Sequence, residues 1–217
     1  MRNEFERQLN QLNQDLMNMS KLCTEAVEKA IHALTDRDSQ PAKQVIDNEK
    51  LINDYESKIN QEAIRLVMCQ QPVASDLRFL SAAIYMNTDL ERIGDQAEDI
   101  SYLVLQMLDQ GYEQRELGAL NEMAKQAVIM IEDSVAAFIK GDSALAKKIC
   151  ESDDIMDDLF VRVRKEVIEE IKEGSLEAEI LTDIMMVAKY MERIGDHATN
   201  IAESIYFSLT GEKIHAD

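Results

Sequence analysis

Two short segments of the sequence carry the same chemistry-bearing residues in the same order. Residues 90–100 read LERIGDQAEDI and residues 191–201 read MERIGDHATNI, so the core ERIGD occurs twice, 101 residues apart. In both copies, oxygen-bearing side chains follow one another at steps of four residues. These side chains are Glu91, Asp95 and Asp99 in the first copy and Glu192, Asp196 and Asn200 in the second. Carboxylates in such a series suit the binding of a hard cation.

Both segments also combine two features that weaken a helix. A step of four residues places side chains on one narrow stripe, where like charges cost roughly 0.2–0.5 kcal/mol per pair. A glycine inside a helix, here Gly94 or Gly195, costs about 1 kcal/mol relative to alanine. Because both costs recur, we expect two shared constraints: a neighbouring backbone packed against each glycine, and a cation held by the carboxylates.

A second pair of acids strengthens the cation hypothesis. Asp153 and Asp157 are again four residues apart, and the internal duplication described below places Glu49 and Asn53 over them. If the helix that carries each pair lies against an ERIGD helix, oxygen donors from two rigid helices face one another. That arrangement is typical of a hard-cation or iron site in a helical bundle.

A simpler interpretation of the same residues stays open. An acidic stripe is often only a solvated helix face, and Arg92 and Arg193 could form ordinary ion pairs beside it. Arg92, for example, lies three residues after Asp89 on the same helix, a spacing that allows an ion pair. His197 follows Asp196 and so points about 100° away from the stripe, which favours a structural or surface role over metal ligation.

Six helical stretches must position these residues. Apolar residues spaced three or four apart run through each stretch, and proline, glycine and capping residues separate the stretches. Asp38 and Asp142, or the serines that follow them, are good N-caps, whereas Pro72 and Gly141 follow helix ends. The predicted helices cover about residues 2–35, 38–70, 72–111, 115–140, 142–173 and 175–210.

The repeat extends well beyond ERIGD. A shift of 104 residues places Asp38 over Asp142 and Lys43 over Lys147, and the offset falls to 101 at ERIGD. Two copies of a three-helix unit explain this pattern, and short turns make neighbouring helices antiparallel. We therefore predict an all-α protein of two tandem, pseudo-symmetric three-helix bundles, with six long antiparallel helices. The first bundle is expected at residues 1–112 and the second at residues 113–217.

The composition fits a helical protein and argues against several functions. The 217 residues include 42 acids and 23 bases, which give a net charge of −19. This charge opposes direct binding to nucleic acid or anionic lipid, which are bound chiefly through Lys and Arg. The three cysteines show no CxxC spacing, so we expect buried, reduced thiols. No apolar run approaches the ~18 residues of a membrane span and no signal peptide is evident, so we expect a cytoplasmic protein.

The sequence resembles the PhoU family, the accessory proteins of phosphate-specific transport systems. The paired ERIGD motifs, QPVASDLR at residues 71–78 and HATNIAE at residues 197–203 carry the resemblance, which covers essentially the whole chain. It implies two three-helix bundles, a homodimer, and in some members a multinuclear iron site or another divalent metal such as zinc, manganese or magnesium. It also implies negative regulation of the phosphate regulon, through contacts with the ATPase subunit of a phosphate ABC transporter and with a sensor histidine kinase. Contact with the membrane would then be made only through these partners.

The resemblance also assigns metal ligands to individual residues. Its paired E(D)xxxD motifs match Glu91 with Asp95 in the first half, and Glu192 with Asp196 in the second. Asp153 and Asp157 match the companion motif of the second half. The first half departs from the motif, because Asn53 stands where an aspartate is expected. An amide oxygen can coordinate a cation but adds no charge, so we expect weaker metal binding in the first half.

Two other functions use the same fold. A carboxylate-bridged di-iron protein of the bundle type needs Glu-x-x-His on two helices. That spacing occurs once in the sequence, at Glu212 and His215 beyond the last predicted helix, which argues against it. A metal-free helical scaffold, whose acids contact a basic partner, needs no ligand set. Neither a nucleophile with a paired base nor a glycine-rich phosphate loop is evident, so we expect a regulator and not an enzyme.

Overall fold

The computed structural model describes residues 2–70, 72–112, 118–174 and 178–214. These residues form seven α-helices and no strand, so the predicted all-α class is confirmed. The first half contains α1 (Arg2–Asp36), α2 (Ser39–Gln70) and α3 (Ala74–Asp109). The second half contains α4 (Gly118–Lys140), α5 (Ser143–Glu151), α6 (Asp153–Glu173) and α7 (Ala178–Thr210).

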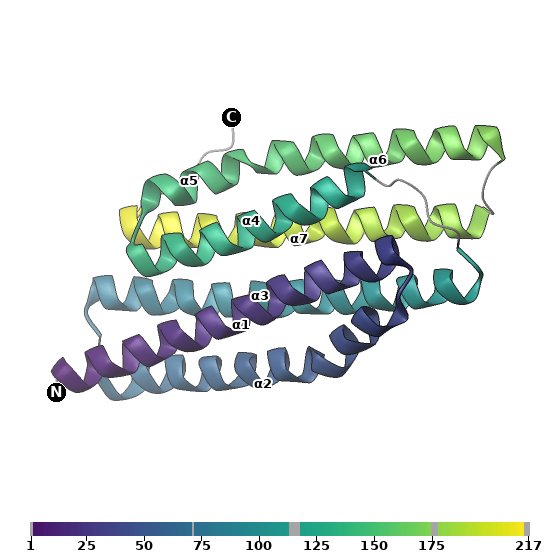
Figure 1. Cartoon of the computed structure of the whole chain (residues 1–217). Helices are drawn as coiled ribbons and strands as arrows, with labels where there is room; N and C mark the ends of the chain where they lie inside the picture. The colour runs from purple at the N-terminus through teal and green to yellow at the C-terminus, as the bar shows by residue number, and fades with distance from the viewer. Residues whose placement is uncertain (1, 71, 113–117, 175–177, 215–217) are drawn as a thin grey trace.

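The helices lie side by side as long rods with their axes roughly parallel or antiparallel (Figure 1). Helices α1, α2 and α3 pack against one another, and α4 to α7 do the same in the second half. The halves meet where α3 packs along α7 and α1 packs along α4. Their apolar side chains form one continuous core. The expected division into domains at residues 112 and 113 therefore stays a prediction.

The predicted fifth helix is interrupted at Ser152, which separates α5 from α6. The Ser152 hydroxyl donates a hydrogen bond to the Lys148 carbonyl at 3.1 Å, and the Ser152 amide bonds the Ile149 carbonyl at 2.9 Å. A serine that bonds back to the preceding turn bends a helix, and the tighter three-residue bond breaks its ladder. The expectation of one uninterrupted helix was wrong here, and Asp153 becomes the first residue of α6.

Most of the predicted helix ends lie close to the observed ones. The Asp142 carboxylate accepts a hydrogen bond from the Leu145 amide at 3.0 Å and caps α5, and Asp38 accepts one from the Gln40 amide at 2.9 Å. Gly141, which follows α4, has φ +64°, a conformation that favours glycine. The expected start of the fourth helix near Arg115 and the start of the sixth at residue 175 lie outside the described residues.

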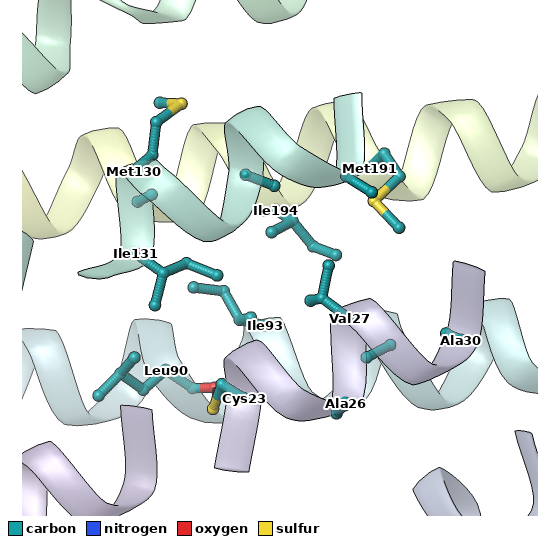
Figure 2. Close-up of a cluster of buried hydrophobic side chains, with 14 of the residues drawn as sticks. Cys23, Ala26, Val27, Ala30, Leu90, Ile93, Met130, Ile131, Met191 and Ile194 are labelled. Atoms are coloured by element: carbon teal, nitrogen blue, oxygen red, sulfur yellow. Dashed lines mark hydrogen bonds between the residues drawn. The ribbon is translucent and has the colours of Figure 1, made fainter. Parts of the chain in front are cut away.

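The two halves share a core that repeats the duplication. Figure 2 shows Ile93 of α3 and Ile194 of α7 between Val27 of α1 and Ile131 of α4. All four side chains are fully buried. Ile93 and Ile194 differ by 101 in residue number, whereas Val27 and Ile131 differ by 104, which are the two offsets of the repeat. The duplicated sequence therefore builds an interface in which equivalent residues meet near a pseudo-twofold axis.

One cysteine belongs to this core. The Cys23 thiol donates a hydrogen bond to the Leu90 carbonyl at 3.2 Å, and burial raises the pKa of Cys23. Cys150 is partly buried, but Cys69 is exposed. The expectation that all three thiols are buried was therefore wrong for Cys69, which lies near the end of α2.

Candidate metal centre

Each ERIGD glycine lies against an apolar side chain of the adjacent helix. A Cβ atom at Gly94 would lie 2.9 Å from Cδ1 of Ile52 in α2, and a Cβ atom at Gly195 would lie 3.0 Å from Cγ of Met156 in α6. Ile52 and Met156 are equivalent under the 104-residue offset. The predicted close approach is thus found in both halves, but a side chain makes it and not the neighbouring backbone. Each glycine brings an acid-bearing helix next to an ERIGD stripe.

In the first half, α2 and α3 bring several carboxylates together. The pKa of Glu91 is raised, chiefly by burial, and then by the negative charges of Asp95, Glu56 and Glu49 against the opposing effect of Arg92. The pKa of Glu98 is also raised, by burial first and next by the charge of Glu49. These shifts indicate that the Glu49 charge of α2 lies near Glu91 and Glu98 of α3.

In the second half, α6 and α7 bring together all four predicted carboxylates. Burial raises the pKa of Asp153, and the charges of Asp157 and Glu192 raise it further. The Thr199 hydroxyl opposes this shift by donating a hydrogen bond to Asp153 at 3.2 Å. The pKa of Asp196 is raised by burial, and then by Glu192, Asp153 and Asp157. The acids therefore repel one another across the α6–α7 junction.

Nearby polar side chains partly neutralise both clusters. Arg92 lies 3.0 Å from Asp95 and 3.4 Å from Glu91, so it forms ordinary ion pairs as the simpler interpretation allows, with these two acids in place of Asp89. Lys189 pairs with Glu192. The Asn53 amide donates a hydrogen bond to Glu49, which turns its NH₂ group towards that carboxylate. With the side chains in these positions, no three Asp, Glu, His or Cys residues of the described chain are placed to hold one metal ion.

The third members of the two stripes lie outside the clusters. Asp99 faces α7, where the pKa of Tyr190 is raised by burial first and then by the charge of Asp99. Asn200 is exposed and forms no hydrogen bond with another described residue. Each step of four residues drifts around the helix, which turns the third position of a stripe away from the first.

The sequence prediction missed two carboxylates of the first cluster. Glu56 lies seven residues after Glu49 and Glu98 lies seven after Glu91, a spacing that returns a side chain to nearly the same helix face. Extending the four-residue pattern to seven would have found both. The equivalent positions in the second half hold Phe160 and Thr199. The first half therefore regains, at Glu56 and Glu98, negative charge that it lacks at Asn53.

The donor chemistry of both clusters fits a hard divalent cation. All the donors are carboxylate or amide oxygens, which suit magnesium, manganese or iron better than soft thiophilic metals. Burial, and then mutual repulsion, raise the pKa values of Glu91, Asp153 and Asp196, and a bound cation would relieve that repulsion. Arg92 and Lys189 would have to release their partners when such a cation binds.

His197 takes no part in either cluster. Its Nδ1 atom lies 3.0 Å from Oδ1 of Asp89, across the junction between α7 and α3. This contact agrees with the structural role that the sequence favours for His197.

No described helix is long and apolar enough to cross a membrane.

Known proteins match this chain over nearly its whole length. Residues 16–104 and 120–205 each match the PhoU domain. A phosphate-specific transport system accessory protein PhoU homolog of Clostridium acetobutylicum is 32% identical over 213 residues, which are 97% of this chain and 96% of the relative. The homolog of Pseudomonas aeruginosa is 30% identical over 97% of this chain and 87% of its own length.

The fold agrees with crystal structures of such proteins. PhoU from Pseudomonas aeruginosa superimposes with a TM-score of 0.90 at 30% identity, over 96% of this chain and 100% of the other. The phosphate transport system regulatory protein PhoU from Streptococcus pneumoniae superimposes with a TM-score of 0.88 at 29% identity, over 98% and 100% of the two chains. The repeated match and the shared fold place this chain in the PhoU family.

Proposed function

We propose that this protein is a negative regulator of the phosphate regulon that acts as a non-enzymatic adaptor. It would bind the ATPase subunit of a phosphate ABC transporter and the sensor histidine kinase of the phosphate two-component system. The observation that carries the proposal is the match over nearly the full length to relatives named as accessory proteins of phosphate-specific transport. We also propose that this protein is cytoplasmic and forms a homodimer. It would contact the membrane only through its partners.

The adaptor role includes a metal ion in our proposal. Asp153, Asp157, Glu192 and Asp196 would hold a divalent cation in the second half, where each of the two helices contributes two carboxylates. Glu49, Asn53, Glu91 and Asp95 are the corresponding residues in the first half. A bound cation would supply positive charge that neutralises the acids and ties α6 to α7, or α2 to α3. The proposed metal is multinuclear iron, zinc, manganese or magnesium.

Phosphate itself has no favourable contact with such a cluster. An anion placed beside Asp153 and Asp196 would meet carboxylates whose pKa values are already raised by burial and by one another's charge. We therefore propose that phosphate status reaches the protein indirectly, through the conformation of the transporter or through a bridging metal. Reversible binding to two partners then carries the signal.

A metal-free scaffold is the second candidate function. It is favoured by the ion pairs of Arg92 with Asp95 and of Lys189 with Glu192, which already neutralise part of each cluster. In that function the remaining acids contact a basic partner surface. Elemental analysis of protein purified without chelator separates the two functions, because a stoichiometric divalent metal would rule against the scaffold.

A binding experiment at two phosphate concentrations tests the adaptor proposal. The tagged full-length protein is incubated with the purified ATPase subunit of the transporter, and separately with the sensor kinase in detergent. We expect both to be retained, and the amount of at least one to change between high and low phosphate. Retention of neither partner at either concentration would contradict the proposal while leaving the family assignment untouched.

A further inference from the structure

A groove lies between the beginning of α3 and the end of α7, away from both acid clusters. Its volume is about 400 Å³. Apolar side chains supply much of its lining, and two of them are open to solvent: Tyr85 is 61% exposed and Phe207 is 44% exposed. Leu77 and Ile214 extend the apolar surface. Volumes and linings of this kind are typical of sites that bind a ligand or an anchoring side chain.

The opposite end of the same helix pair is built differently. There Gln106 of α3 donates a hydrogen bond to Asp183 of α7 at 3.2 Å, which bridges the two helices. The 101-residue offset relates Gln106 to Phe207 and Asp183 to Ala82. A polar pair therefore bridges the two helices at one end. At the groove, a phenylalanine and an alanine occupy the equivalent positions. This replacement leaves an apolar surface uncovered at the end that carries Phe207.

The duplication also reverses one charge of the groove. Two cations, Arg78 and Lys213, line it, whereas the residue equivalent to Arg78 is Glu179. The Nε atom of Arg78 donates a hydrogen bond to the Ser208 carbonyl at 3.1 Å, which fixes the guanidinium at the rim. Among the described residues, neither Arg78 nor Lys213 forms an ion pair. The terminal nitrogens of Arg78 are therefore available to an incoming carboxylate.

One acid, Glu203, also lines the groove. Its charge helps to raise the pKa of Cys150 in α5 to about 12, after the larger effect of burial. Glu203 thus acts on Cys150 of α5, and within the described part of the chain no ion pair joins it to Arg78. The two cations that line the groove outnumber its one acid, in a chain whose net charge is −19.

We propose that this groove docks a segment of a partner protein that carries a carboxylate beside apolar side chains. Arg78 binds the carboxylate with its planar fork, Lys213 adds a second positive charge, and Tyr85 and Phe207 contact the apolar side chains. An acidic segment is repelled by most of this protein, so attraction confined to the groove fixes where it binds. The inference rests on the proposed adaptor function, because it assigns a surface to one of the partners.

A displayed library of random twelve-residue peptides tests the groove without knowledge of the partner. The probe is selected on the immobilised full-length protein, and enriched peptides are measured by fluorescence anisotropy. We expect enrichment of peptides with Asp or Glu next to Leu, Phe or Trp. Tyr85→Ser and Arg78→Gln should each weaken their binding at least about tenfold. Met186→Ser, at the position equivalent to Tyr85, and Tyr102→Ser, an exposed tyrosine of the same helix, should leave it unchanged.

A third variant rebuilds the polar bridge inside the groove. The double substitution Ala82→Asp with Phe207→Gln copies the pair found at the opposite end, and should abolish binding. Tyr85→Ser keeps the test decisive if this double variant does not fold, because Tyr85 is exposed. A basic consensus, no enrichment, or enriched peptides that bind Tyr85→Ser as tightly as the natural protein would overturn the inference. A change of oligomeric state in Tyr85→Ser would also overturn it, because a second copy would then be the occupant.

The same variants separate this inference from the adaptor function. If the natural protein retains the ATPase subunit or the kinase, and Tyr85→Ser and Arg78→Gln retain both equally well, the groove inference fails and the adaptor function stands. If the natural protein retains neither partner, the adaptor function fails, whatever the peptides show.

Discussion

The Nδ1 atom of His197 in α7 lies 3.0 Å from Oδ1 of Asp89 in α3. The contact joins the two halves, and each side chain is only 18% exposed. The duplication relates Asp89 to Tyr190 and His197 to Gln96, so the pair occurs once although the interface is repeated. An interaction formed by two bonded, half-buried polar groups contributes more than an exposed ion pair does.

A double-mutant cycle on this pair should therefore give a measurable coupling energy. We expect Asp89→Asn with His197→Gln to show a coupling of about 0.5–1 kcal/mol in urea unfolding. The control pair is Arg162 with Glu122, whose side chains are 50% and 53% exposed at 2.6 Å. Its coupling should be smaller, because water screens it. A larger coupling in the control pair would show that the α3–α7 contact has no special weight.

The two ERIGD glycines should respond differently to alanine. At Gly94 the new Cβ would meet Cδ1 of Ile52 at 2.9 Å and the stiff Cγ2 branch at 3.1 Å. We expect Gly94→Ala to lower the free energy of unfolding by about 1–2 kcal/mol, because overpacking exceeds the gain in helix propensity. At Gly195 the neighbour is the unbranched Met156, which can move, so Gly195→Ala should change it by less than about 0.5 kcal/mol.

Relief of the contact checks that explanation. Ile52→Val removes the Cδ1 atom, so Gly94→Ala should cost less in that background than in the natural protein. Equal costs in the two backgrounds would mean that the close approach to Ile52 does not explain the glycine.

The buried Asp183 should make stability depend on pH. Its pKa is raised by burial, and then by the charge of Glu179, whereas the hydrogen bond from Gln106 opposes the shift. The folded protein thus keeps the Asp183 proton to higher pH than the unfolded protein does. The stabilisation that results is fully present below the pKa that Asp183 has in the unfolded state. It is lost as pH rises through the raised folded value.

Substitution of Asp183 removes that loss. The stability of Asp183→Asn relative to the natural protein should therefore increase between about pH 4 and neutral pH. Gln106→Ala should steepen the loss, because it removes the bond that favours the charged carboxylate. Thermal unfolding from pH 4 to pH 7 measures both effects, and an advantage of Asp183→Asn that is largest at pH 4 would contradict the prediction.

Metal binding should depend on Asp157 more than on its equivalent, Asn53. Asp157 contributes a charge to the α6–α7 cluster, whereas Asn53 offers an amide oxygen already turned beside Glu49. In calorimetric titration with Mn²⁺, Asp157→Ala should therefore lose more affinity than Asn53→Ala. Both side chains are exposed, so neither change should disturb the fold. Equal losses would argue against the proposed ligand sets.

Much of the architecture could be predicted because helix period, caps and duplication agree with one another. Asp38, Gly141 and Asp142 mark helix ends in the sequence and lie at them in the structure. The break at Ser152 was missed because it depends on one hydroxyl that bonds back to the preceding turn. Hydrophobic periodicity indicates which face of a helix a residue lies on. It carries little information on whether a side chain competes for the hydrogen bonds of the backbone.

The candidate site was predictable only in part, for a similar reason. Spacing along one helix correctly placed Glu91 and Asp95 on a stripe, but it could not show that Asp99 turns towards Tyr190 of α7. The close approach at Gly94 was predicted, yet the identity of Ile52 as its partner needed the register between α2 and α3. Contacts between helices that are distant in sequence depend on packing, which one helix alone does not encode.

Repression of the phosphate regulon is the role proposed for this protein. The most direct measurement is expression from a phosphate-starvation promoter, in cells that lack the gene and grow in abundant phosphate. We predict high expression in these cells, and its return to the repressed level when the natural protein is supplied from a plasmid. Expression that stays repressed without the gene, and does not change when the protein is restored, would contradict the claim.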